Sequence, residues 1–168
     1  MERVPITKSE LKEVMSKYKG HVIATTACLG GELSTYANIM SVAEEKNQED
    51  IIQECYDHII AFMCECKDIF GQDFYVECAP SLSAEQKRVN RKLYKIAKAF
   101  EVPMVIGTDA HYLTKEDRFV HKAYLNSKGG EREVDDFYEF ARLMDFDEAE
   151  EILAESFDGR RDIAEQII

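Results

Sequence analysis

Two segments of this 168-residue sequence combine residue types that could bind a metal ion. In the first, Gly107-Thr-Asp109-Ala-His111, a carboxylate and an imidazole are two residues apart. On an extended chain this spacing directs both side chains to the same side. Oxygen and nitrogen donors of this kind suit zinc or manganese better than magnesium. Asp109 and His111 are therefore candidate ligands, although such a pair also fits an Asp that caps a turn and a His bonded to a loop carbonyl.

The second segment contains Cys28, which is followed by Gly30 and Gly31. Glycines let the backbone approach closely, and a thiolate here would be a soft ligand if its strand lies beside the one that ends near Asp109. An inert core thiol is the alternative. Glu77 could reach the same edge and support the ligands without binding the ion. The other histidines are assigned structural or surface roles: His21, His58 and His121.

The composition is that of a folded, water-soluble chain, with 45% apolar and 32% charged residues. Apolar runs are far shorter than the ~20 residues of a membrane-spanning helix, and the first residues lack the apolar stretch of a signal peptide. We therefore expect a cytoplasmic protein without a membrane partner. The sequence contains no Gly-x-Gly-x-x-Gly, Walker loop or nucleophile elbow, which argues against nucleotide binding and serine-type catalysis.

The net charge argues against DNA as a binding partner, and the cysteine spacing argues against a disulfide framework or a zinc knuckle. The formal net charge is −12, which opposes binding to DNA because that affinity comes largely from cations placed against phosphates. The five cysteines form no Cys-x-x-Cys pair, so neither a disulfide framework nor a zinc knuckle is expected, and most should be reduced core thiols.

Helix and strand signals alternate along the chain. Helix starts are predicted where a hydroxyl precedes an acid or amide by three residues, at Thr7, Ser83 and Thr114. Apolar periodicity predicts one long helix over about 48–68, after a shorter helix over 34–46. Buried strands are expected at 21–27, 74–78 and 103–107. Connections too long for hairpins favour parallel strands, so the fold class is α/β with a parallel sheet or barrel and a helical tail split near Gly159.

In chain order, several blocks resemble the PHP (polymerase and histidinol phosphatase) domain of bacterial DNA polymerase III alpha subunits, and together they are more specific than any one alone. The blocks are Thr7-Lys-Ser-Glu-Leu11, Gly20-His-Val-Ile-Ala24, Ala27-Cys-Leu-Gly-Gly-Glu32, Asp73-Phe-Tyr-Val-Glu77, Glu85-Gln-Lys-Arg-Val-Asn90, Val102-Pro-Met-Val-Ile-Gly-Thr-Asp-Ala-His-Tyr-Leu113, Glu116-Asp117 and Ser156-Phe-Asp-Gly-Arg-Arg-Asp-Ile-Ala-Glu165.

The resemblance implies a distorted (β/α)7 barrel whose strand ends hold metal ions for phosphoester hydrolysis or proofreading exonuclease activity. Matched residue by residue, the family's ligands fall on Cys28, Asp109 and His111. The family's opening His-x-His motif and its next His and Glu ligands would precede Met1. The resemblance therefore implies an incomplete barrel and an incomplete metal site, too small for the two-metal clamp of phosphodiester cleavage.

We accordingly expect residues 1–150 to be the C-terminal portion of a PHP domain and 151–168 a helical tail leading towards a polymerase palm. The expected function is that of a DNA replication fragment, inactive in isolation, that self-associates through exposed barrel edges and, in its parent, meets other replisome proteins. Two alternatives are a free-standing metal-dependent phosphoesterase that completes its site by oligomerisation, and an acidic interaction module of the replisome.

Overall fold

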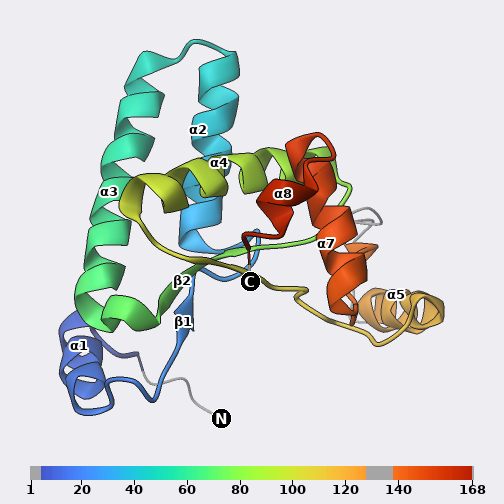
Figure 1. Cartoon of the computed structure of the whole chain (residues 1–168), viewed down its shortest axis with the longest axis horizontal. Coiled ribbons are helices and arrows are strands. Elements are labelled where there is room, and N and C mark those ends of the chain that lie inside the picture. Colours follow the sequence, from blue (N-terminus) through green and yellow to red (C-terminus); the bar gives the residue numbers. More distant parts are fainter. Residues whose placement is uncertain (1–4, 128–137, 168) are drawn as a thin grey trace.

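The computed structural model describes residues 5–127 and 138–167, and within these ranges short parallel strands alternate with helices (Figure 1). The elements, in chain order, are α1 (Lys8–Lys17), β1 (Ala24–Thr25), α2 (Glu32–Glu45), α3 (Glu49–Phe70), η1 (Gly71–Asp73), β2 (Phe74–Cys78), α4 (Ala84–Phe100), β3 (Met104–Ile106), η2 (Lys115–Asp117), α5 (Arg118–Ser127), α7 (Phe146–Ala154), η3 (Glu155–Phe157) and α8 (Arg161–Ala164).

The three strands form one open parallel sheet in the order β1-β2-β3. Ala24 of β1 lies opposite Phe74 of β2, and Val76 of β2 lies opposite Met104 of β3. The predicted mixture of helices and parallel strands is confirmed. The expected barrel is not formed within the described residues, where the sheet does not close and β1 and β3 are its two edges.

The strand expected at 21–27 is much shorter in the structure, since β1 comprises only Ala24 and Thr25. This strand pairs with β2 alone, and β2 begins at Phe74, opposite Ala24, so residues before Ala24 have no neighbouring strand there. After Thr26, the positive φ of 62° at Ala27 ends the extended conformation. The length of β1 is therefore set by where its neighbour β2 begins, and sequence propensity does not encode this.

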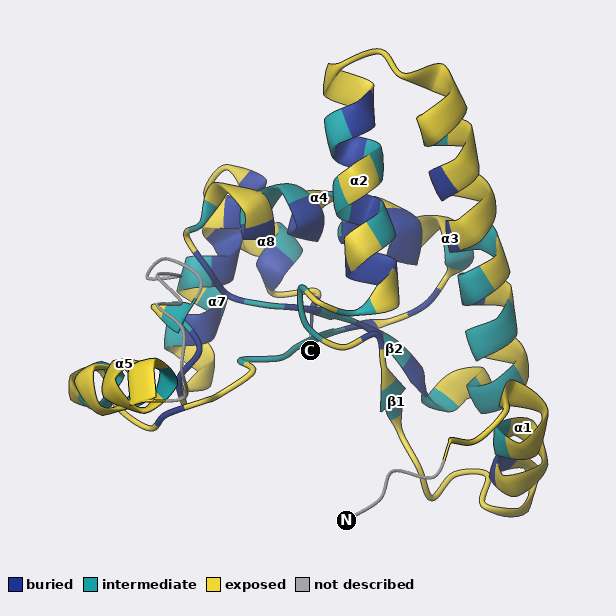
Figure 2. Cartoon of the chain, turned by 180° about the vertical axis from the view of Figure 1, so that it is seen from behind, coloured by how far each residue is buried: buried dark blue, intermediate teal, exposed yellow. Residues whose placement is uncertain are grey.

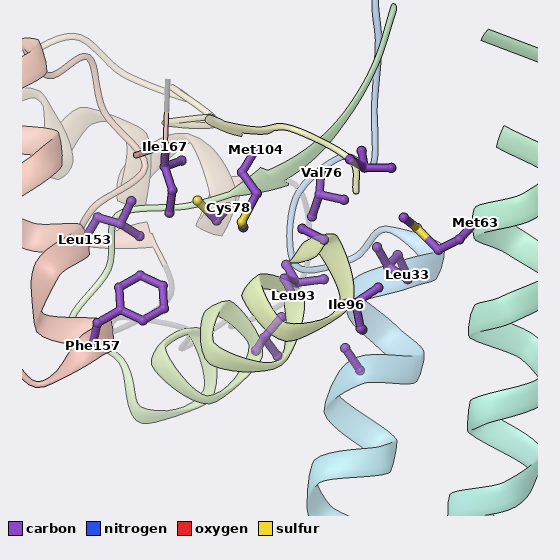
Figure 3. Close-up of a cluster of buried hydrophobic side chains, with 14 of the residues drawn as sticks. Leu33, Met63, Val76, Cys78, Leu93, Ile96, Met104, Leu153, Phe157 and Ile167 are labelled. Atoms are coloured by element: carbon purple, nitrogen blue, oxygen red, sulfur yellow. The ribbon is translucent and has the colours of Figure 1, made fainter. Parts of the chain in front are cut away.

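Helices cover one face of the sheet. Phe74, Val76 and Cys78 of β2 are buried in the main core, where side chains of α2, α3, α4 and the C-terminal helices meet them (Figure 3). Tyr75 and Glu77 point to the opposite face and are only half-buried. No second helical layer therefore covers this face within the described residues, contrary to the expectation of fully buried strands.

The helix predictions from capping and periodicity are confirmed. Thr7 and Glu10 form a capping box at the start of α1, and the Ser83 hydroxyl accepts a hydrogen bond from the Gln86 N–H at the start of α4. The long helix α3 ends at Gly71, whose φ is 60°. Helices α2 and α3 pack along each other as an arm that rises from the sheet, with its far end largely exposed (Figure 2).

The C-terminal helices pack on the same core as the sheet. The expected boundary at residue 150 falls within α7, and buried Leu153, Phe157 and Ile167 join the main hydrophobic cluster. Buried Asn90 of α4 donates hydrogen bonds to Ala79 O and Ser156 Oγ, both at 2.9 Å. The predicted break between two short helices is present at Gly159, whereas the break predicted at 128–130 lies outside the described residues.

Across the described ranges, no helix is long and apolar enough to cross a membrane.

Candidate functional site

The loop after β1 places Cys28 at the carboxyl edge of the sheet. Thr26 is buried, and its hydroxyl accepts a hydrogen bond from Glu77 N–H at 2.9 Å, which fixes the loop to β2. The backbone then reverses so tightly that a Cβ atom at Gly31 would lie 2.4 Å from Thr26 O. Gly31 N–H also donates to Cys28 O at 2.8 Å. A side chain at position 31 is therefore excluded by backbone atoms, so the anticipated close approach is found at Gly31 but not at Gly30, where nothing lies within 4 Å of a Cβ position.

Asp109 and His111 follow β3 at the same edge. Gly107 N–H donates to Cys78 O at 2.9 Å, which continues the pairing of β3 with β2 just past the strand. Asp109 then has a φ of 44°, in the left-handed region that Asp tolerates better than most residues. Asp109 Oδ1 lies 3.5 Å from His111 Nε2, and both side chains are more than a third exposed. The two side chains therefore lie close together, although the backbone at Asp109 is left-handed and not extended as the spacing argument assumed.

Cys28 lies beside Asp109. The pKa of the Cys28 thiol is raised, mainly because burial disfavours the thiolate and further because the Asp109 carboxylate is close, while backbone hydrogen bonding at Gly30 acts against this shift. Both residues line a small pocket of about 30 Å³ together with Thr108 and Gln86. Without a bound cation, Cys28 therefore carries a neutral thiol, and a metal would have to displace its proton.

Glu77, which was expected to support the candidate metal ligands, lies apart from Asp109 and His111. Its carboxylate accepts a hydrogen bond from Thr25 Oγ1 at 2.6 Å and lies against Gly107 on the uncovered face of the sheet. Among the described residues, no hydrogen bond or ion pair is seen between Glu77 and Asp109 or His111. Glu77 therefore lies on the central strand β2 and contacts Thr25 of β1 on one side and Gly107, just after β3, on the other.

His121, assigned a structural role from the sequence, packs beside His111. Their ring centroids are 5.6 Å apart, and the His121 ring also stacks on Tyr112 at 5.4 Å. Burial, followed by the positive charges of His111 and Arg118, lowers the pKa of His121. The only sequence signal near this His111–His121 contact was the capping motif at Thr114, which precedes η2 and α5. A capping motif marks where a helix begins, but it does not specify which side of that helix faces the rest of the chain.

The donor set does not amount to a metal cage. Cys28 contacts Asp109, and Asp109 contacts His111, yet residues 5–127 and 138–167 contain no group of three His, Cys, Asp or Glu side chains placed to hold one ion. The chemistry of the donors fits zinc or manganese, but the geometry of this chain offers too few of them.

Comparison with known proteins relates the chain to DNA polymerases. It is 45% identical over 152 residues to the probable DNA polymerase YorL of Bacillus subtilis, a match that covers 90% of this chain and 12% of that protein. A DNA-directed DNA polymerase of Bacillus phage SPbeta matches with the same identity and coverage. The DNA polymerase III subunit alpha of Aquifex aeolicus is 38% identical over 113 residues, 67% of this chain and 8% of that protein. No family model matches the chain.

The chain is therefore a homologue of one segment of bacterial and phage DNA polymerases. More particularly, it is related to the DNA polymerase III alpha subunit, as its sequence blocks predicted. Because it spans only 12% of the first two relatives, the activity of the whole polymerases is not transferred to it.

Proposed function

We propose that this chain serves DNA replication as the counterpart of a PHP-type segment of a DNA polymerase, and that Cys28, Asp109 and His111 are its contribution to a divalent-metal site. In this proposal the chain alone does not cleave phosphodiesters. In the polymerase context, its partners would be the remaining polymerase and other replication proteins.

Two observations support this proposal. The similarity to DNA polymerases extends over 90% of the chain, which carries the replication role. The loops after β1 and β3 bring Cys28, Asp109 and His111 to one edge of a parallel sheet, the edge at which α/β proteins gather functional residues.

The lack of independent cleavage follows from the number of donors. A two-metal mechanism needs ligands that bridge ions about 4 Å apart, and the described residues do not supply three ligands for even one ion. A single weakly held ion could polarise a phosphate oxygen but would lack the second ion that stabilises the leaving group.

The test is metal binding measured by calorimetric titration with Zn²⁺ and Mn²⁺ and by metal content after purification without chelator. Wild type is compared with the double variant Asp109→Ala, His111→Ala. The matched control is Asp57→Ala, His58→Ala, which removes an exposed pair of the same residue types from α3. We expect weak binding of one ion per chain in wild type and control, and its loss in the site variant.

Equal binding by the wild type and the site variant, or none by the wild type, would overturn the assignment of these ligands. The same proteins are assayed with bis(4-nitrophenyl) phosphate and with single-stranded DNA in Mn²⁺, Zn²⁺ or Mg²⁺. We expect no turnover. Hydrolysis that disappears in the site variant would instead support the free-standing phosphoesterase that completes its site by oligomerisation.

A further inference from the structure

Helix α4 concentrates positive charge on an otherwise acidic protein. It contains six lysines and arginines and a single acid, Glu85, whereas the whole chain has a formal net charge of −12. Its buried side, which includes Val89, Leu93 and Ile96, packs in the main core, and none of the six cations lies on that side. Figure 1 shows α4 lying across the helical side of the sheet, where it packs against α2. The positive charge therefore points outward from a helix that is anchored in the core.

Four of these cations form one stripe. Arg88, Arg91, Lys95 and Lys98 follow one another at intervals of three, four and three residues, so they share one side of α4. Like charges at these intervals repel and slightly destabilise a helix. A stripe of cations along one side of a helix is the electrostatic pattern typical of a surface that meets a polyanion.

The two remaining cations of α4 are held by acids of neighbouring elements. Lys92 Nζ lies 2.7 Å from Glu44 Oε1 of α2, and Lys87 Nζ lies 4.0 Å from Glu155 Oε2 of η3. The side chains of these two lysines are only 13% and 25% exposed. They therefore help to fix α4 between its neighbours and are not part of the stripe.

Within the stripe, carboxylate partners are scarce. Arg91 Nη1 lies 3.6 Å from Asp158 Oδ1, but the side chain of that aspartate is 90% exposed, and a surface pair of this kind contributes little. Arg88 donates its hydrogen bonds to the amide oxygen of Asn38 and not to an acid. For the two lysines of the stripe, no ion pair is seen with any residue that the structure describes. Most of the positive charge is therefore accessible to a partner.

The chemistry of the stripe suits a phosphate backbone better than a protein or an unpaired base. No large apolar side chain of α4 is exposed, whereas the centre of a protein interface is usually apolar or aromatic. Tyr94, beside the stripe, packs edge-on against Phe157 and has Lys98 Nζ 5.4 Å from its ring centre. This ring is therefore not free to stack on a base, as binding of single strands commonly requires.

The spacing of the charges also fits duplex DNA. From Arg88 to Lys98 the helix rises about 15 Å, at about 1.5 Å per residue. Each strand of a duplex carries one phosphate per about 3.4 Å of helix axis, so this length passes about four phosphates. The four cations of the stripe thus meet a similar number of negative charges.

We propose that Arg88, Arg91, Lys95 and Lys98 contact the phosphate backbone of double-stranded DNA. The choice of DNA rests on the proposed replication role, whereas the stripe by itself indicates a regularly charged polyanion. Contacts to phosphates position a protein on a duplex without reading its sequence. Because the rest of the chain is acidic, the contact is weak in isolation, and it orients the duplex more than it holds it.

Fluorescence anisotropy of a fluorescein-labelled 20-bp duplex, titrated with the full chain in EDTA, tests the proposal. We expect weak binding at 20 mM NaCl, with a slope of log K against log [NaCl] of about −3 to −4, since each phosphate contact contributes about −0.9. Lys95→Gln should reduce the magnitude of this slope by about one. Lys95→Glu should weaken binding by at least about fivefold.

The matched controls are Lys19→Gln and Lys19→Glu, which make the same charge changes at an exposed lysine just after α1. They should leave the slope and the affinity close to those of the wild type. Equal effects of the Lys95 and Lys19 substitutions would show that only net charge matters and would overturn the proposal. So would a wild type that does not bind the duplex at 200 µM protein and 20 mM NaCl. Circular dichroism verifies that each variant is folded.

Two further ligands test the choice of partner. A poly-glutamate peptide that displaces the duplex as well as unlabelled duplex does, at equal total charge, would overturn the proposal in favour of an acidic protein segment. Tighter binding of a 20-nucleotide thymidine strand would overturn it in favour of single-stranded DNA. Because EDTA removes divalent ions, none of these outcomes depends on the metal site, and Lys95→Glu should leave Zn²⁺ binding unchanged.

Discussion

The carboxylate of Glu77 and the α-carbon of Gly107 are in direct contact between β2 and the end of β3: a Cβ atom at position 107 would lie 2.2 Å from Glu77 Oε1. The carboxylate is held there by the hydrogen bond from Thr25 Oγ1 at 2.6 Å. Three neighbouring strand segments are thus joined through one acidic side chain on the uncovered face of the sheet. Gly107 fits here because it has no side chain.

The first prediction concerns this contact. Gly107→Ala should cost roughly 1–2 kcal/mol, because Glu77 must leave its rotamer and its hydrogen bond with Thr25. In a Glu77→Ala background the same substitution should be close to neutral. Urea denaturation of the two single variants and the double variant measures the coupling energy. Additive effects would show that the contact does not constrain Glu77.

The turn before α2 gives a second prediction. Gly31→Ala should destabilise the fold by about 2 kcal/mol or more, since the new Cβ would meet a backbone carbonyl oxygen that cannot rotate away. Gly30→Ala is the matched control, because nothing lies within 4 Å of its Cβ position, and it should change stability by less than about 0.5 kcal/mol. Thermal unfolding of both variants provides the measurement, and equal stabilities would contradict the close approach at Gly31.

Acid stability should depend on Glu148. Hydrogen bonding to buried Arg142, supported by Lys115, lowers the pKa of Glu148 from 4.5 to about 2. Because the folded-state pKa is depressed, this carboxylate stabilises the fold above pH 4.5 and loses its contribution as the pH falls from 4.5 towards 2. Glu148→Gln should flatten the decline of the melting temperature in that window, whereas Glu54→Gln on the exposed side of α3 should not. A Glu148→Gln profile parallel to wild type would count against this ion pair.

Thiol reactivity provides a test of the Cys28–Asp109 contact. Burial raises the pKa of Cys78 to about 12 and that of Cys66 to about 11, so both should react slowly with iodoacetamide at pH 8, while exposed Cys64 should react first. Asp109→Asn should accelerate alkylation of Cys28, because the nearby negative charge that raises its pKa is removed. Peptide mass spectrometry follows each site, with Cys64 as the internal reference. An unchanged Cys28 rate would indicate that Asp109 does not influence the thiol.

Local order could be predicted from the sequence because its causes are local. Hydroxyl caps at Thr7 and Ser83 mark helix starts through bonds that span three residues, and the apolar spacing of α3 and α4 defines their buried sides. The bounds of β2 at residues 74–78 were also predicted, but its half-buried second face was not. The position of Cys28, Asp109 and His111 at one edge of the sheet follows from the same reasoning, because the carboxyl ends of parallel strands meet at one edge, whereas their action as one metal site stays a prediction.

Only the tertiary structure decided what these elements leave uncovered. The length of β1 was set by the first residue of β2, which lies opposite it. The position of the Glu77 side chain was set by its contacts with Thr25 and Gly107. The contact of His121 with His111 was set by the orientation of α5. Likewise, the apolar pattern of α5 shows that the helix is amphipathic but not which side faces the chain. Each of these outcomes depends on residues distant in sequence that compete for the same space, and a one-dimensional pattern does not record that competition.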